Sequence, residues 1–219
     1  MYNFAILDPR PAGEKANELV FTNSVGVLGI EVTVPALAGQ CSLGNIDPQH
    51  AGGDNGQAAI EVAMTADLPP KGATLATVRA DLDSVGAMAV LALRVKGESL
   101  EPALKRIALV ATADKFARGN WPGVRPLPSK TNPWPEEASS AEASKPLAAM
   151  AAAVSDFKVP LSDRVAVMLG WLSSGEEPES YRGKVELERQ GMVAALESGE
   201  IRTEVPEQYN GVPRCVDHG

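Results

Sequence analysis

Cysteine and histidine are scarce in this chain, with two residues of each among 219. Cys41 and Cys215 stand apart, so the sequence lacks both the cysteine pattern of a disulfide framework and the Cys-x-x-Cys pairs of a structural zinc site. His218 lies at the extreme C-terminus, where chains are commonly poorly ordered. His50 is therefore the histidine that we consider for chemistry.

Long apolar runs are also lacking, and none approaches the length that spans a bilayer. The first residues, MYNFAILDPRP, do not contain the basic region and apolar stretch of a signal peptide. We therefore expect a cytoplasmic protein without a membrane partner.

Positive charge is in deficit, with 20 Lys and Arg against 28 Asp and Glu and a formal net charge of −8. An extended nucleic-acid-binding surface needs clustered Lys and Arg, so this balance argues against one. It leaves room for a small phosphorylated molecule, which needs only a local basic or metal site.

Aromatic residues make up 5% of the chain, so we expect an aliphatic core. The pattern predicts an α/β fold with an N-terminal, mostly parallel sheet and flanking helices, followed by a helical C-terminal part. The expected organisation is an α/β domain over 1–118, a Pro-rich connection or lid over 119–144, and a helical region over 145–219. The apolar helices of the last region suggest a homodimer surface.

The expected elements follow from periodicity and from helix-stop residues. Strands are predicted over 2–7, 25–34, 73–79 and 201–205, and a helical turn over 35–42. Helices are predicted over 57–65 with Asp54 or Asn55 as cap, from Asp83 or Ser84 to about Val95, after Ser99, and over 145–155, 162–173 and 178–196.

The segment Asp81-Leu82-Asp83-Ser84-Val85-Gly86 gives the strongest functional signal. It lies where a predicted strand passes into an apolar helix, and its two carboxylates are two residues apart. Hard divalent cations such as Mg²⁺ and Mn²⁺ prefer oxygen ligands, which carboxylates supply with charge. The structural alternative is that Asp83 caps the helix and Asp81 is solvated.

The polar stretch GNIDPQHAGGDNG, residues 44–56, gives a second signal. Asp47 and His50 lie here in a predicted loop after a strand, and imidazole can ligate a metal or transfer a proton near neutral pH. The alternative is a polar turn in which Asp47 bonds its own backbone and His50 is exposed.

A third signal comes from Asp114, predicted near the C-terminal end of a helix, where the helix dipole disfavours a carboxylate. Such a charge suggests a partner, either a metal or Arg118. Arg118 and Arg125 border the Pro-rich segment and are candidates for binding phosphate. An exposed helix end with solvated charges is the simpler interpretation.

The segment ATVRADLDSVGAMAVLAL resembles the first metal-binding motif of the DHH-type metal-dependent phosphoesterases. In this resemblance Asp81 and Asp83 match metal-binding aspartates, and Ser84 and Gly86 match the surrounding framework. NIDPQH is similar to the Asp-His-His motif, with Asp47 as its aspartate and His50 as a histidine, and Asp114 takes the part of a further acidic ligand. The sequence departs from the family at Thr77, where a histidine is expected, and in the order of the two motifs.

Together these features predict a hydrolase of a small phosphate ester or phosphoanhydride, such as a nucleotide, that depends on Mn²⁺ or Mg²⁺. The predicted metal ligands are Asp47, His50, Asp81, Asp83 and Asp114, the predicted catalytic residues are His50 and Asp81, and Arg118 or Arg125 orients the substrate. Two alternatives stay open: a non-catalytic α/β module that binds a ligand or protein, and a metal-independent enzyme that uses His50 as acid or base.

Overall fold

The computed structural model describes residues 1–48, 56–115, 139–204 and 214–217. The chain divides into two compact units. The first comprises Met1–Lys115 and Met150–Glu176, and the second comprises Phe116–Ala149 and Glu177–Gly219. The candidate functional residues that the structure describes all belong to the first unit.

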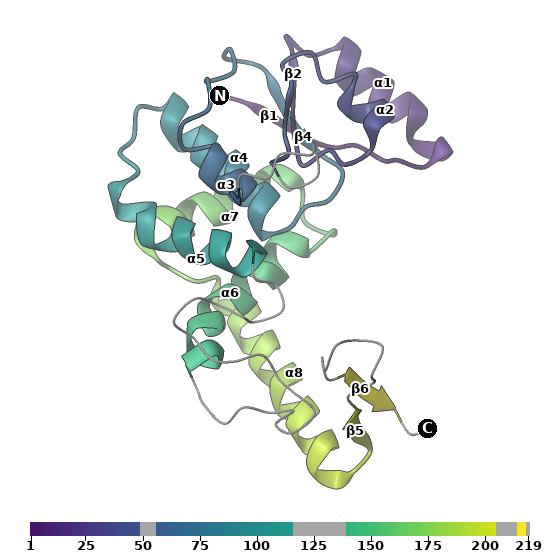
Figure 1. The fold of residues 1–219 in the computed structure, drawn as a ribbon, viewed down its shortest axis with the longest axis vertical. Helices are drawn as coiled ribbons and strands as arrows, with labels where there is room; N and C mark the ends of the chain where they lie inside the picture. Colours follow the sequence, from purple (N-terminus) through teal and green to yellow (C-terminus); the bar gives the residue numbers. More distant parts are fainter. Residues whose placement is uncertain (49–55, 116–138, 205–213, 218–219) are drawn as a thin grey trace. The chain divides into compact units, whose positions relative to one another are not determined.

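A four-stranded parallel sheet forms the centre of the first unit (Figure 1). Its strands are β1 (Asn3–Ile6), β2 (Val27–Ile30), β3 (Asn45–Ile46) and β4 (Thr74–Thr77), in the order β1-β4-β2-β3. Each neighbouring pair is parallel. The predicted α/β fold with an N-terminal parallel sheet is therefore confirmed.

Helices of the first unit lie between these strands in the chain or follow the last of them. They are η1 (Pro11–Gly13), α1 (Glu14–Thr22), α2 (Pro35–Ala38), α3 (Ala59–Val62), α4 (Leu82–Val95), η2 (Glu101–Ala103), α5 (Leu104–Lys115), the end of α6 (Ser139–Ser155), and α7 (Leu161–Ser174). Parallel strands need such crossovers, and both of their faces are then buried.

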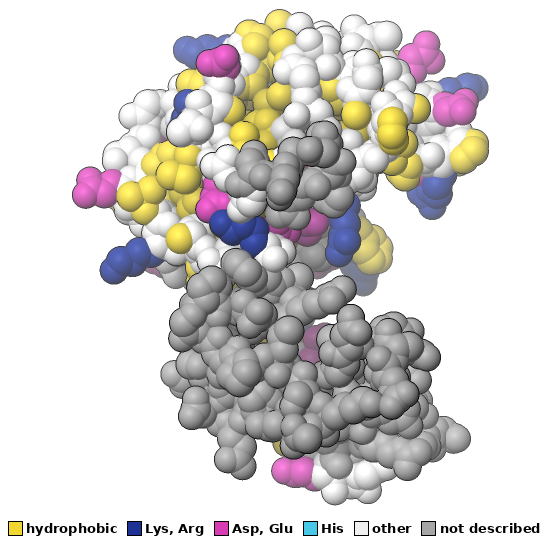
Figure 2. All heavy atoms as spheres, in the orientation of Figure 1, with side chains coloured by type: hydrophobic (Ala, Val, Ile, Leu, Met, Phe, Trp, Pro, Cys, Tyr) yellow, Lys and Arg dark blue, Asp and Glu magenta, His cyan; other side chains and the backbone are white. Residues whose placement is uncertain are grey.

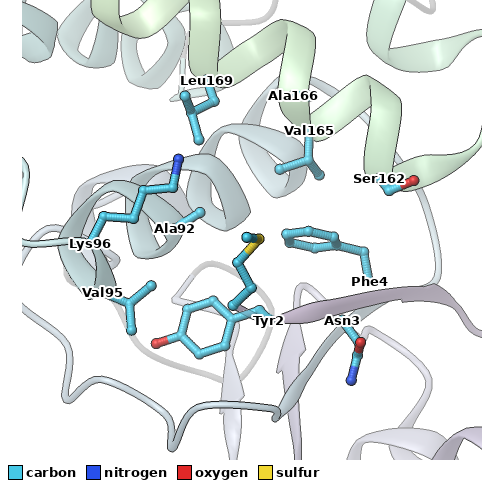
Figure 3. Close-up of a pocket in the computed structure, with 11 residues that line it drawn as sticks. Tyr2, Asn3, Phe4, Ala92, Val95, Lys96, Ser162, Val165, Ala166 and Leu169 are labelled. Atoms are coloured by element: carbon cyan, nitrogen blue, oxygen red, sulfur yellow. The ribbon is translucent and has the colours of Figure 1, made fainter.

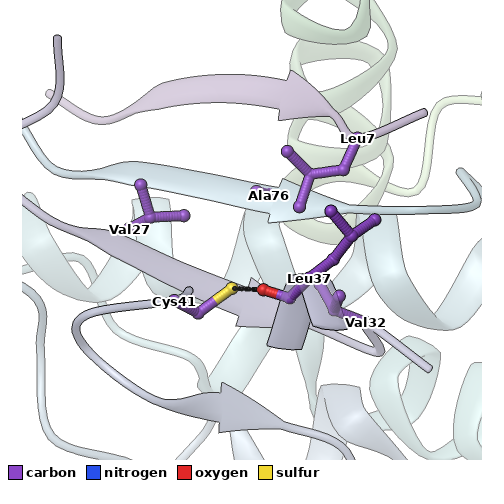
Figure 4. Packing of buried hydrophobic residues seen from close by; sticks show 6 residues of the cluster. All are labelled: Leu7, Val27, Val32, Leu37, Cys41 and Ala76. Carbon is purple, nitrogen blue, oxygen red and sulfur yellow. Dashed lines mark hydrogen bonds between the residues drawn. The ribbon is translucent and has the colours of Figure 1, made fainter. Parts of the chain in front are cut away.

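One face of the sheet packs against α1 and α2. A buried aliphatic cluster joins Leu7, Val27, Val32, Leu37, Cys41 and Ala76 (Figure 4). Val20 and Phe21 of α1 pack against the cluster. The Cys41 thiol is buried and donates to the Leu37 carbonyl at 3.5 Å, so this cysteine acts as a small core residue.

On the other side, α4 is the central helix of the unit, in contact with α3, α5, α7 and β2. Ten of its residues are buried, including Val85, Met88 and Leu91, as expected for a helix that is apolar nearly all round. Gly86 lets α3 approach closely, because a Cβ at this position would lie 2.6 Å from Cδ1 of Ile60. Arg94 then donates to the Ala63 and Ala66 carbonyls and caps the end of α3.

The second unit contains the first part of α6, α8 (Glu179–Ser198) and a two-stranded antiparallel sheet. The sheet pairs β5 (Ile201–Glu204) with β6 (Arg214–Asp217). Helix α6 begins at Ser139, so the prediction of irregular structure up to residue 144 is wrong at 139–144. Ala141, Glu142 and Ala143 in this stretch are good helix formers, and residues 116–138 lie outside the described residues.

Three further differences from expectation concern the first unit. Helix α1 was not predicted, because its polar face dominates the pattern. The strand expected over 25–34 ends at Ile30, since Glu31 turns the backbone. The helix expected after Ser99 starts with the 3-10 turn η2 before α5, on which Ile107, Val110 and Ala111 are buried while Leu104 and Ala108 are exposed. A search of the described residues found no helix with the length and apolar character needed to cross a membrane.

Candidate functional site

Acidic residues follow the carboxyl ends of three adjacent strands. Glu31 comes directly after β2, Asp47 directly after β3, and Asp81 and Asp83 follow β4. Because β4, β2 and β3 are neighbours and run parallel, these ends meet at one edge of the sheet, which is where open α/β sheets bind ligands. Asp114, near the end of α5, adds a fifth carboxylate whose charge acts on Glu31. We call these five residues the acidic cluster.

Glu31 has a backbone conformation that is uncommon for a residue with a side chain, with φ of 52°. The chain on either side of it is held in place. The Glu31 amide donates to the Ile46 carbonyl at 2.8 Å. The Asn45 side chain accepts from the Val32 amide at 3.2 Å and donates to the Val32 carbonyl at 3.1 Å. The end of β3 therefore fixes the turn that places Glu31 in the cluster.

Glu31 is also the most perturbed carboxyl group of the cluster. Burial is the largest cause and raises its pKa from 4.5 to about 9, with additional repulsion from Asp83, Asp81, Asp114 and Asp47. Glu31 therefore carries a proton at neutral pH unless a positive charge enters the cluster. Because all four of these aspartates act on Glu31, the four predicted aspartate ligands lie within electrostatic reach of this residue.

Asp83 is buried, with 1% of its surface exposed, and its two carboxylate oxygens accept from the first amides of α3. Oδ2 accepts from Ala59 at 2.7 Å and Oδ1 from Ile60 at 2.8 Å. Burial raises the pKa of Asp83 to about 7, against the lowering effect of these amides. The expectation that Asp83 caps its own helix is wrong, since it caps α3 instead.

Asp81 is the residue that caps α4. Its Oδ1 accepts from the Ser84 amide at 3.0 Å, and the Asp81 amide donates to the Ser84 hydroxyl at 3.1 Å. Arg79 lies 3.7 Å from its other oxygen, Oδ2, but the arginine side chain is 84% exposed, so solvent screens this pair. Oδ2 therefore remains accessible to a further positive partner.

Thr77 ends β4 where the phosphoesterase resemblance leads one to expect a histidine. It is fully buried, and its hydroxyl donates to the Arg79 carbonyl at 2.9 Å and accepts from the Arg79 amide at 3.2 Å. Thr77 therefore shapes the turn that leads to Asp81 and offers no imidazole to the cluster.

Asp47 is buried and Asp114 is partly buried. Next to Asp114, Lys115 pairs with Glu61 of α3 at 2.9 Å, so this ammonium group is already engaged outside the cluster. Near the centre of the face drawn in Figure 2, acidic and basic side chains lie next to one another.

Three of the predicted site residues, His50, Arg118 and Arg125, lie outside the described residues, as do the proposed caps Asp54 and Asn55. In the parts of the chain that the structure describes, no group of three or more His, Cys, Asp or Glu side chains is arranged to hold a metal ion. The structure thus brings Asp47, Asp81, Asp83 and Asp114 into one electrostatic neighbourhood, which is looser than a closed coordination shell.

Glu31 is the site residue that sequence reasoning missed. It stands in VGVLGIEVTV, which alternates like one continuous strand, so nothing in the pattern separated it from the strand residues. The one signal that could have found it is its charge, because a buried strand rarely contains a charged residue and Glu31 stands within a β-branched run.

The donor chemistry of the cluster is that of oxygen-only ligands, which suits Mg²⁺ and Mn²⁺ better than a thiolate-preferring metal. Comparison of the chain with protein-family models, with curated proteins and with solved structures gave no match.

Proposed function

We propose that this chain is a hydrolase of a small phosphate ester or phosphoanhydride, such as a nucleotide, that uses a divalent cation held by the acidic cluster. The observation that carries the proposal is the gathering of five carboxyl groups at the carboxyl edge of the sheet, where burial, and after it repulsion from the four aspartates, raises the pKa of Glu31 to about 9. Protons or a cation must offset this repulsion, and a divalent cation does so without neutralising the ligands.

Asp81 and Asp47 are the strongest candidates to hold the ion, since they follow β4 and β3, the two strands on either side of β2 in the sheet. Asp83 also qualifies, because each carboxylate oxygen has a second lone pair beyond the one used by its amide. His50 and Asp114 would complete the ligand set, as predicted from the sequence.

A bound divalent cation would supply two things, a lowered pKa for an attacking water and neutralisation of charge on the phosphoryl oxygens. The chain's own residues have separate tasks. Glu31, protonated in the absence of a cation, would release that proton when the cation binds and would then accept a hydrogen bond or a proton from the attacking water as a carboxylate. His50 would protonate the leaving group if it is not a ligand, and Arg118 or Arg125 would orient the phosphate.

The direct test combines metal analysis with an activity screen on the full chain. Protein purified without chelator is expected to contain Mn²⁺ or Mg²⁺ and to hydrolyse p-nitrophenyl phosphate or bis-p-nitrophenyl phosphate. Asp81→Asn is expected to lose both properties. Glu18→Gln, an exposed carboxylate on α1, is the matched control and is expected to keep both.

Two results would exclude this function. The first is protein without metal that shows no turnover after Mn²⁺ or Mg²⁺ is added. The second is turnover in metal-free protein that is abolished by His50→Ala, which would favour the metal-independent enzyme with His50 as acid or base.

One observation favours a second candidate, a non-catalytic α/β module that binds a ligand or a protein. Asp81 caps α4 and Asp83 caps α3, so two of the predicted ligands already have structural tasks. On this alternative, Asp81→Asn lowers stability and leaves metal content and catalysis unchanged at background level. Measuring the unfolding midpoint of this variant beside its metal content separates the two candidates.

A further inference from the structure

A pocket of about 510 Å³ lies within the first unit, away from the carboxyl edge of the sheet (Figure 3). It is bordered by the residues that begin β1, by the end of α4 and by α7. These elements place it at the amino end of an edge strand, whereas the acidic cluster follows the carboxyl ends of β2, β3 and β4. The pocket is therefore a separate feature that the proposed function does not use.

The walls of this pocket are mainly apolar. Phe4 comes from β1, Ala92 and Val95 from α4, and Val165 and Leu169 from α7, and Figure 3 shows these side chains around one space. A pocket of this size and lining is within the range that accommodates a small ligand. Its apolar walls favour a ligand with an apolar body, because burial of that surface drives binding.

Polar groups at the pocket are few. Tyr2 lines it with its ring, while its hydroxyl donates to the Pro69 carbonyl at 3.1 Å. Lys96 borders the space and supplies a positive charge, and none of the residues lining this pocket, all of them described, is acidic. A ligand that carries one negative charge is therefore favoured over a neutral or cationic one.

The charge on Lys96 is available for a ligand. Its ammonium group lies 3.7 Å from Glu98, and the two side chains are 43% and 46% exposed. An exposed ion pair of this kind contributes little to stability, so a ligand anion can replace Glu98 at little cost. In Figure 3 the Lys96 side chain runs along the pocket with its nitrogen toward Leu169.

We propose that this pocket binds an apolar monoanion of the fatty-carboxylate class, with the hydrocarbon chain among Phe4, Val95 and Val165 and the carboxylate at Lys96. The proposal rests on the shape and charge of the pocket and is independent of the acidic cluster. Its failure would leave the hydrolase proposal untouched.

The test is isothermal titration calorimetry of the full chain with decanoate and, separately, with decan-1-ol. Wild-type protein is expected to bind decanoate at one site. Lys96→Gln is expected to weaken decanoate roughly tenfold, about the effect of losing one charge-assisted contact, and to leave decan-1-ol unchanged. Lys105→Gln, an exposed lysine on α5, is the matched control and is expected to change neither.

A second variant tests the position of the site. Ala166 lines the pocket and is exposed, so Ala166→Phe is expected to fold and to fill the space, abolishing the binding of both compounds. Ala92→Met fills it from α4 with a smaller, flexible side chain and gives an independent check. Circular dichroism and a thermal midpoint confirm folding in each case.

Any of three results would overturn the proposal. These are no decanoate binding to wild-type protein, equal effects of Lys96→Gln and Lys105→Gln, and unchanged binding in folded Ala166→Phe. If Ala166→Phe instead changes the oligomeric state in gel filtration and wild-type protein does not bind decanoate, the pocket is a contact between copies of the chain.

Discussion

Replacing Glu31 with glutamine should make the stability of the protein less dependent on pH. The raised pKa of Glu31, from 4.5 in an unfolded chain to about 9 in the fold, means that the folded state holds a proton that the unfolded state has released. The contribution of Glu31 to stability is therefore greatest below pH 4.5 and is lost as the pH rises through the window from 4.5 to about 9. Glutamine keeps the size and polarity of the side chain and cannot ionise.

The size of the effect follows from proton linkage. One group that differs by a full proton between the two states changes the free energy of unfolding by about 1.4 kcal/mol per pH unit. Between pH 5 and pH 7, Glu31 should therefore remove about 3 kcal/mol of stability from the wild-type protein. Because Asp83 shares the same repulsion, this figure is an upper bound for one member of a coupled pair.

The assay is urea denaturation followed by circular dichroism at pH 5, 6, 7 and 8 in the presence of a chelator. The difference between wild type and Glu31→Gln should grow with pH, with the variant the more stable of the two at pH 7. Glu18→Gln, which removes an exposed carboxylate, should parallel the wild type. A difference between Glu31→Gln and wild type that stays constant across this range, within about 0.5 kcal/mol, would refute the assignment of Glu31 as a buried, protonated acid.

Further expectations concern other positions of the first unit. Because Glu31 has a positive φ, Glu31→Gly should be more stable than Glu31→Ala by about 1 kcal/mol in the same assay at pH 5, and equal stability would contradict the backbone assignment. Asp83→Ala removes the acceptor of the first two amides of α3, so the hydrogen exchange of these amides at pH 8 should become about 10-fold to 100-fold faster. The increase should be smaller in Asp83→Asn, and unchanged exchange rates would show that Asp83 does not cap α3. Gly86→Ala should lower the free energy of unfolding by about 1–3 kcal/mol, because the new methyl group meets Ile60. Gly170→Ala, in open space on α7, should raise the free energy of unfolding by about 0.5–1 kcal/mol. A change of the same sign at both glycines would show that α3 does not pack closely on α4.

Much of the fold could be predicted because its signals are local. The strand at Thr74–Thr77 and the helix at Leu82–Val95 were expected from a short β-branched run and a long apolar one, and both were confirmed. The two-residue strand Asn45–Ile46 could not be predicted, because it exists only through its pairing with β2 and through the Asn45 side chain.

The candidate site was predictable in its residue types and not in its contacts. That Asp81 follows a strand, and that Asp47 lies in a loop, could be inferred from the sequence, whereas the strand that Asp47 directly follows, β3, could not. Parallel strands of one sheet then bring such residues to the same edge. Which amides Asp83 would meet depended on how α3 packs against α4, and that packing is set by Gly86 and Ile60, residues of two separate helices. Glu31 belongs to the site because of a backbone turn at a positive φ, and the pattern of side chains does not predict that turn.

The most direct test of the acidic cluster as a cation site is calorimetric titration of the full chain with Mn²⁺ at pH 7.5 in two buffers of different ionisation heat. Cation binding should displace the proton from Glu31, so the account predicts one bound ion per chain together with the release of about one proton. Glu31→Gln should bind Mn²⁺ without releasing that proton, and Asp81→Asn should bind Mn²⁺ weakly or not at all. Wild-type protein that shows no more Mn²⁺ binding than Asp81→Asn, or that binds Mn²⁺ without releasing a proton, would contradict the account.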